Sequence, residues 1–187
     1  MKTKTLDLDK LSSNDPKVKY GFAKELLKIG ADTPELLYDH LDYWTKMLIS
    51  DNNILKWTAI DIIGYLSTVD KENKIDKLIN DLLFYLHGGH LITCNHAIFA
   101  LGLIAQNKPG HRSGLIQELL AISKDTFDTE ECKNIATGKV LAILNNFMDD
   151  IKNNKETIDF IKQAKKCNRN ATVKKADLLL KKITVLS

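Results

Sequence analysis

The chain has 187 residues, of which 44% are hydrophobic and 27% are charged, and only three are proline. This composition suits a folded helical protein and argues against disorder or a loop-rich sandwich. The length is in the range of one domain, so we expect residues 1–187 to form a single domain.

The sequence also argues against a membrane or secreted location. Met1–Lys10 has no apolar core of the kind that a secretory signal requires, and the longest apolar run, Ala97–Ala105, has nine residues, too few to span a bilayer. Cys94, Cys132 and Cys167 are an odd set with wide spacing, which fits reduced thiols rather than a disulfide framework. We expect a soluble, cytoplasmic protein without disulfides.

Apolar residues recur at helical spacing from one end of the chain to the other, and no convincing strand pattern is present. Taken in chain order, the pattern predicts helices over Val18–Ile29, Glu35–Ile49, Leu55–Leu66, Glu72–Leu86, Thr93–Ile104, His111–Ser123, Lys133–Leu144, Asn154–Lys165 and Thr172–Ile183. The fold class that this pattern predicts is all-α.

Residues at several boundaries have the chemistry of helix ends. Asp15 and Thr33 each precede a proline, and Thr129 precedes two glutamates, so all three are expected N-caps. Gly30 and the pair at 88–89 are expected to end helices, because glycine adopts the left-handed conformation common there. Short connections predict that consecutive helices lie antiparallel.

One helix pattern repeats along the chain. Its anchor residues are Leu26, Ile63, Leu101, Leu141 and Leu180, which are separated by 37, 38, 40 and 39 residues. That near-constant period fits a helical hairpin that must stack on its neighbours to bury its apolar stripe. We expect about five hairpins, roughly over residues 1–30, 31–69, 70–107, 108–148 and 149–187. Small residues at one repeated position, Gly64, Gly102 and Ala142, are expected to let helices approach closely.

The second residue of the repeated helix is lysine in two copies, Lys19 and Lys56, and the fifth residue is alanine in three copies, Ala59, Ala97 and Ala176. The ninth residue is leucine or isoleucine, and glycine follows it in the clearest copies. This pattern resembles the HEAT repeat family and is loosely shared with armadillo repeats. The resemblance implies a right-handed α-α superhelix whose second helices line a concave surface.

Three positions of each second helix lie opposite its buried stripe at about 100° per residue. The residues at these positions include Tyr20, Lys24, Trp57, Asp61, Tyr65, Asn95, Phe99, Leu103, Ile135, Lys139, Ile143, Lys174 and Lys182. Because exposed aromatic residues often anchor interfaces, we expect a non-enzymatic scaffold that binds a peptide or helix through Tyr20, Lys24, Trp57, Asp61, Tyr65, Asn95, Phe99 and Lys139. The alternative is that neighbouring helices cover these side chains as core.

Trp57 and Asp61, one turn apart, also resemble a feature of HEAT-like alkylpurine DNA glycosylases. In that family a carboxylate beside aromatic residues stabilises positive charge on the nucleoside, a role that would fall to Asp61, with Trp57 in the aromatic cradle. The family has an arginine in the following repeat, where this chain has His96.

The C-terminal end is basic, with ten Lys or Arg against three acids in residues 151–187. A nucleic acid or an acidic protein is a possible partner for this end, and a polar cap on the last repeat explains the same lysines. The basic residues are Lys162, Lys165, Lys166, Arg169, Lys174, Lys175, Lys181 and Lys182.

His87, His90, Cys94 and His96 are close together in the sequence, and His90 with Cys94 has an i, i+4 spacing that is compatible with zinc. No second Cys/His pair follows them, so we expect no metal site. The sequence also has no phosphate-binding glycine loop or nucleophile motif, and we predict neither a cofactor nor a catalytic residue.

Overall fold

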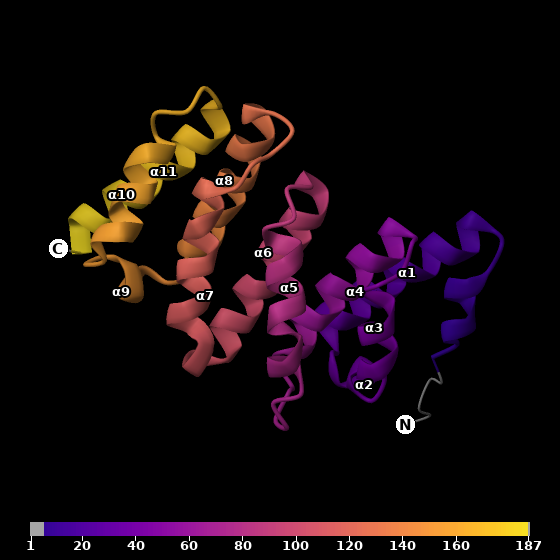
Figure 1. The fold of residues 1–187 in the computed structure, drawn as a ribbon. Helices are drawn as coiled ribbons and strands as arrows, with labels where there is room; N and C mark the ends of the chain where they lie inside the picture. Colours follow the sequence, from indigo (N-terminus) through magenta and orange to yellow (C-terminus); the bar gives the residue numbers. More distant parts are fainter. Residues whose placement is uncertain (1–5, 187) are drawn as a thin grey trace.

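The computed structural model describes residues 6–186, which form helices and contain no strand (Figure 1). The prediction of an all-α fold is confirmed. The α-helices are α1 (Pro16–Asp32), α2 (Glu35–Tyr38), α3 (Leu41–Met47), α4 (Asn53–Leu66), α5 (Ile79–Leu86), α6 (Leu91–Asn107), α7 (Pro109–Ala121), α8 (Glu130–Leu144), α9 (Met148–Ile151), α10 (Lys155–Ala164) and α11 (Asn170–Leu186). Three 3₁₀ helices, η1 (Leu8–Ser12), η2 (Ile75–Leu78) and η3 (Ile122–Lys124), join them.

Five helices pack one against the next through the length of the molecule, in the order α1, α4, α6, α8 and α11. The other helices flank this series: α3 packs on α4, α5 on α6, α7 on both α6 and α8, and α10 on α11. Figure 1 shows the helices following one another from the N-terminal end to the C-terminal end. Each helix of the central series therefore contacts mainly the helices before and after it in that series, and contacts are mostly between segments near each other in the sequence.

The helix predicted over Glu35–Ile49 is instead two helices, α2 and α3, with a break at Asp39 and His40. The buried indole of Trp44 donates a 3.0 Å hydrogen bond from Nε1 to the carbonyl oxygen of Leu37. The backbone N–H of His40 bonds to the same oxygen at 3.1 Å. These bonds occupy a carbonyl that a continuous helix would use for the next turn, which stabilises the break.

The helix ends match the predictions only in part. Asp15 Oδ1 accepts from the N–H of Lys17 at 2.8 Å and the Thr129 hydroxyl accepts from that of Cys132 at 3.1 Å, so both caps are confirmed. Thr33 was predicted wrongly, because it follows the last turn of α1 and its N–H bonds to the carbonyl of Ile29. Gly89 has φ +75° and forms the expected turn.

Glycines lie where helices of the central series come closest. A Cβ on Gly64 would be 2.7 Å from the Cα of Ala100, and one on Gly102 would be 2.8 Å from Cδ1 of Ile143. Gly30 was predicted to end a helix, but α1 continues past it and a Cβ there would be 3.0 Å from the Tyr65 ring. Gly30, Gly64 and Gly102 therefore permit the close approach of α1, α4, α6 and α8.

Ala142 was predicted to permit a similar approach between α8 and its neighbour, and this prediction was wrong because Ala142 is exposed. Gly138, one turn earlier on α8, has that position. A Cβ on Gly138 would be 2.6 Å from Oγ1 of Thr172 on α11. The Thr172 hydroxyl also donates to the carbonyl of Asn134 at 2.8 Å, which holds the two helices together.

A buried ionic cluster fixes the turn after α4 to the start of α7. Lys108 Nζ lies 2.8 Å from Oδ2 of Asp70 and 2.7 Å from Oδ1 of Asp76, and the Lys108 and Asp70 side chains are 7% and 0% exposed. Tyr38 donates its hydroxyl hydrogen to Oδ1 of Asp70 at 2.5 Å, and His111 Nε2 lies 2.9 Å from Oδ2 of Asp76. The cluster joins α2, the segment from the end of α4 to η2, and the start of α7.

The pKa values of the two carboxyl groups reflect these contacts. Burial disfavours the charged form of Asp70, but hydrogen bonds from Lys108, Tyr38 and two backbone N–H groups outweigh it, so its pKa lies below the usual range. The hydrogen bond from Lys108 is the largest cause of the lowered pKa of Asp76. Both groups are therefore charged in the folded protein at neutral pH.

Gly64→Ala should destabilise the protein by about 2 kcal/mol, because the new methyl group meets the backbone of α6 and forces two helices apart. Gly21→Ala is the matched control, since no atom lies within 4 Å of a Cβ at this position inside α1. The control should be stabilised by about 0.5–1 kcal/mol, the usual difference between alanine and glycine in a helix. Urea unfolding measures both values, and equal effects would contradict the close-approach account.

Lys108→Met should cost about 3 kcal/mol at neutral pH, because it leaves a buried carboxylate without its cation. A lowered folded-state pKa means that the stabilisation is present above the unfolded pKa of about 4 and is lost as pH falls further. Unfolding curves from neutral to acidic pH should show this loss in the wild type and a smaller loss in Lys108→Met. Lys155→Met, which removes an exposed ion pair with Asp159, should change little. An unchanged acid dependence in Lys108→Met would refute the role of the cluster.

Candidate functional site

The apolar side chains predicted to lie opposite the buried stripe are half-buried in the structure, and we refer to them as the apolar row. They are Tyr20, Trp57, Tyr65, Phe99, Leu103, Ile135 and Ile143. The Tyr65 ring contacts Gly30 on α1 and meets the Phe99 ring edge to face at 5.3 Å on α6. Ile143 on α8 contacts Gly102 on α6. Side chains of the row thus lie at the α1–α4, α4–α6 and α6–α8 interfaces.

Trp57 on α4 is held in one orientation by two groups of α6. Its Nε1 donates a 3.0 Å hydrogen bond to Oγ1 of Thr93, and its ring stacks on the His96 imidazole at a centroid distance of 5.5 Å and an interplanar angle of 9°. His96 Nδ1 lies 2.8 Å from Oδ1 of Asp61, one turn further along α4. The three side chains form a Trp57–His96–Asp61 cluster that joins two helices.

The Asp61 carboxyl group is turned into this helix interface. Its side chain is 14% exposed, and burial raises its pKa, while the hydrogen bond and the charge of His96 lower it. A carboxylate bound to His96 in this way positions the imidazole against the indole. Its contacts are to the protein itself, rather than to the open surface that sequence analysis assigned to it.

The other predicted site residues differ in their exposure to solvent and in their hydrogen-bond partners. Tyr20 accepts a 3.0 Å hydrogen bond at its hydroxyl from Nδ2 of Asn52, and Lys24 and Lys139 are exposed. Asn95 is half-buried, and its Oδ1 is buried with no donor among residues 6–186. Asn95 therefore belongs more to the helix packing than to an open surface.

Lysines lie at both ends of the apolar row. Lys24 on α1 and Lys139, Lys174 and Lys182 on α8 and α11 are exposed. Burial and the charges of Lys139 and Arg169 lower the pKa of Lys175, which donates to the carbonyl of Gly138 at 2.8 Å. Apart from Asp61, the positions opposite the buried stripe contain no carboxylate, so this face is positively charged.

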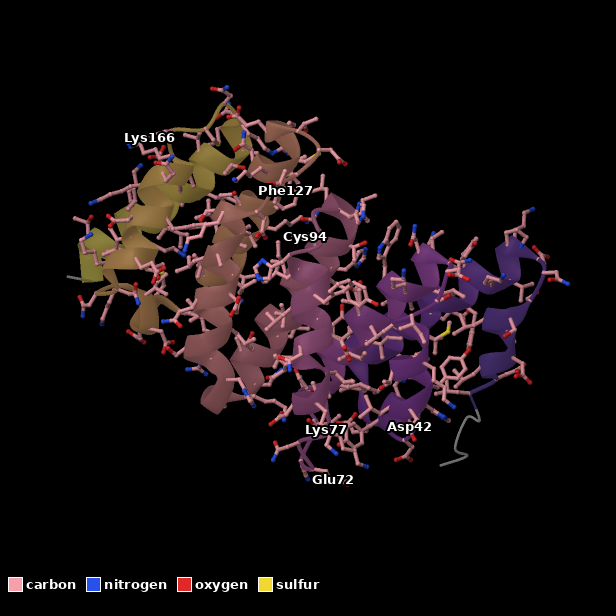
Figure 2. All side chains as sticks on the ribbon, viewed as in Figure 1. Asp42, Glu72, Lys77, Cys94, Phe127 and Lys166 are labelled. Carbon is pink, nitrogen blue, oxygen red and sulfur yellow. The ribbon has the colours of Figure 1, made fainter. Side chains whose placement is uncertain are left out.

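Part of the basic C-terminal end is neutralised within the protein. Lys165 lies 2.9 Å from Oδ1 of Asp177, and Arg169 pairs with Glu131 on α8. Lys166 lies at the end of the molecule opposite to Asp42 (Figure 2). These ion pairs tie α10, α11 and α8 together, which is a structural use for two of the eight basic residues.

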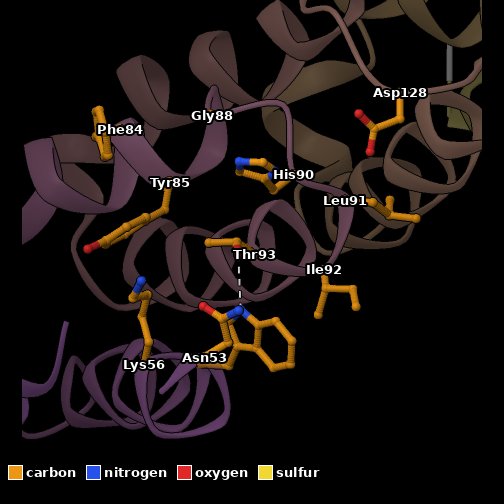
Figure 3. Close-up of a pocket in the computed structure, with 11 residues that line it drawn as sticks. Asn53, Lys56, Phe84, Tyr85, Gly88, His90, Leu91, Ile92, Thr93 and Asp128 are labelled. Atoms are coloured by element: carbon orange, nitrogen blue, oxygen red, sulfur yellow. Dashed lines mark hydrogen bonds between the residues drawn. The ribbon is translucent and has the colours of Figure 1, made fainter. Parts of the chain in front are cut away.

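A pocket of about 710 Å³, which we call the edge pocket, opens where the N-terminal ends of α4 and α6 meet the end of α5. Figure 3 shows Tyr85, His90 and Thr93 in its lining, and Trp57, which also lines the pocket, donates a hydrogen bond from Nε1 to Thr93. Its full lining is Asn53, Lys56, Trp57, Phe84, Tyr85, Gly88, His90, Leu91, Ile92, Thr93 and Asp128. Trp57 thus belongs both to the apolar row and to this pocket.

The histidines and cysteine considered as metal ligands have other partners or positions. His87 Nδ1 lies 2.7 Å from Oδ2 of Asp125 and its Nε2 lies 3.2 Å from Oε2 of Glu118. Cys94 is buried, and burial raises the pKa of its thiol to about 12. Within residues 6–186 no group of three or more His, Cys, Asp or Glu side chains is arranged to hold a metal ion. Cys94, Cys132 and Cys167 are free thiols.

Two features of this region were not predicted from the sequence: the contact of His96 with Trp57 and Asp61, and the place of Phe84 and Tyr85 in the edge pocket. His96 was noted as a metal or glycosylase position and not as the partner of Trp57 and Asp61. Its position 35 residues after Asp61, close to one repeat period, is a signal for that contact. Phe84 and Tyr85 were not predicted as site residues, because the apolar stretch that contains them has the pattern of a buried helix face.

Comparisons with known proteins give the fold and no family. No protein-family model matches the chain, and no curated protein matches it significantly. The crystal structure of an engineered protein is similar, with a TM-score of 0.54 and 16% identity over 95% of this chain and 78% of that chain. At this identity the likeness extends to the helical fold alone. Separately, none of the helices in residues 6–186 is long and apolar enough to cross a membrane.

His96→Ala should raise the pKa of Asp61, because it removes the two contributions that hold this pKa down. A raised folded-state pKa means that stability is lost as pH rises through it, so the variant should be less stable at neutral than at mildly acidic pH. The carboxyl ¹³C shift of Asp61 measures the titration, and that of the exposed Asp159 is the control. An unmoved Asp61 titration would contradict the cluster.

Proposed function

We propose that this chain is a HEAT-like α-solenoid of about five hairpins that binds a helix or peptide of a partner protein on its concave surface. In this proposal α1, α4, α6, α8 and α11 are the second helices of the hairpins and line that surface. The protein acts by holding its partner and carries out no reaction of its own.

The apolar row is the observation that carries the proposal. Seven large apolar side chains from four successive helices remain half-buried rather than buried, although the core beneath them is complete. Two of the rings are fixed by hydrogen bonds, Trp57 to Thr93 and Tyr20 to Asn52, so little side-chain entropy is lost when a partner covers them. Rigid aromatic side chains of this kind are frequent anchors in interfaces.

The arrangement of the rings favours a protein partner over bases that stack. One face of the Trp57 indole is occupied by His96, and Tyr65 and Phe99 pack edge to face on each other. Stacking platforms for single-stranded nucleic acid need aromatic faces that bases can reach. The exposed lysines at the ends of the row suit a peptide with an apolar face and acidic residues on either side.

Trp57→Ala and Phe99→Ala should each weaken partner binding by about 2 kcal/mol, which is roughly thirtyfold in Kd. Asp61→Asn should leave binding unchanged, because the amide oxygen can still accept a hydrogen bond from Nδ1 of His96 and the bond to Thr93 still holds the Trp57 indole. Affinity capture with these baits, with nuclease and in low and high salt, identifies a protein, and calorimetry with the purified partner measures Kd. If wild type and Trp57→Ala both recover nucleic acid, and high salt releases it, the result would instead favour the basic C-terminal end as the binding surface.

A further inference from the structure

The edge pocket is bordered by strongly exposed apolar side chains. Phe84 is 73% exposed, Ile49 is 82% exposed and Ile92 is 52% exposed. Phe84 also lines a second pocket, of about 290 Å³, together with Ile49. The Phe84 ring therefore stands between two depressions, and we call the two pockets with these three side chains the edge patch. Exposed apolar patches next to a preformed hollow mark interaction surfaces.

The walls of the edge pocket are fixed by bonds inside the chain. Tyr85, shared by both pockets, donates its hydroxyl hydrogen to the carbonyl oxygen of Leu48 at 2.5 Å. The Trp57 indole, which also lines the pocket, is bonded to Thr93. The pocket is consequently present without an occupant, whereas the neighbouring Phe84 has no hydrogen-bonding group and projects into solvent. The patch thus contains a projection and a matching hollow side by side.

Charge on the edge patch is balanced. Lys56 and Asp128 line the edge pocket, and Lys46 and Asp81 line the second pocket. No ion pair or hydrogen bond within residues 6–186 involves any of these four side chains, whereas Lys165 and Arg169 at the C-terminal end are each paired with a carboxylate. Two lysines and two aspartates around one apolar centre can pair with each other across a two-fold axis.

We propose that the edge patch is the contact between two copies of this chain, in a two-fold symmetric dimer in which Phe84 of each copy enters the edge pocket of the other. An isologous contact requires one patch to carry both the projection and the hollow and to be complementary to itself in charge. The edge patch meets both requirements. The apolar row lacks this complementarity in charge, because the exposed charged residues at its ends are lysines. This inference does not depend on the proposed function.

Sedimentation velocity over a range of protein concentrations tests the proposal. The wild type should show a monomer–dimer equilibrium, and Phe84→Asp should weaken the dimer by at least about a hundredfold, since it places a charge in an apolar contact. Ile92→Asp is a second variant at the rim, so the test survives if one variant folds poorly. Leu178→Asp, at a 60% exposed leucine on α11 outside the patch, is the control and should leave the dimer intact.

Charge exchange tests the two-fold arrangement itself. Lys46→Glu with Lys56→Glu leaves four acidic groups on the patch and should weaken the dimer by about tenfold or more. Adding Asp81→Lys and Asp128→Lys restores the balance and should restore dimerisation, and circular dichroism confirms that each variant is folded. A wild type that stays monomeric at the highest concentration, or a dimer that resists Phe84→Asp and Ile92→Asp, would overturn the proposal.

Discussion

The close contact between α4 and α6 is the constraint on which the rest of the structure depends. Gly64 lets the two backbones approach until no room is left for a methyl group, and the same helices are joined by the Trp57–His96–Asp61 cluster. Because α1 packs on α4 and α8 packs on α6, this central pair sets the positions of the helices on both sides. Packing at Gly64 and the orientation of the Trp57 ring are therefore parts of one interface.

That interface also explains how one face combines rigidity with half-buried apolar side chains. Trp57 and Ile143 of the apolar row pack against the core, and neighbouring groups hold Trp57, Tyr65 and Phe99 by a hydrogen bond and ring contacts. The ionic cluster at Asp70 and Lys108 joins the segments that follow the C-terminal ends of the same two helices, α4 and α6. A surface preorganised in this way loses little freedom on binding, which is the property expected of a scaffold.

Much of the architecture follows from the sequence because it is periodic and local. The spacing of apolar residues located α1, α4, α6, α8 and α11 to within a few residues, and it identified Trp57, Tyr65 and Phe99 as lying off the buried stripe. The break between α2 and α3 was not predictable, because it depends on one indole reaching one carbonyl. Ala142 was chosen by its place in the repeat, but the rotation of α8 brings Gly138 to the contact instead.

The candidate site was predictable only where it depends on position within a helix. Asp61 was expected to face a partner, yet His96 of α6 binds it; their separation of 35 residues indicates that the two can lie near each other but not that their side chains bond. The edge pocket combines residues of α4, α5, α6 and the segment before α8, whose convergence depends on how neighbouring helices are offset along their axes. Such features arise from tertiary packing, which the periodicity of a single chain does not encode.

Site-specific photo-crosslinking tests the central claim most directly, namely that the apolar row holds a protein partner. A photoreactive amino acid at Phe99, within the row, should crosslink in cells to one protein, at a peptide with apolar and acidic residues. The same amino acid at Leu36, which is 47% exposed on α2 outside the central series, should not crosslink to that protein. Equal crosslinking from both positions, or crosslinks from Phe99 to nucleic acid alone, would contradict the account.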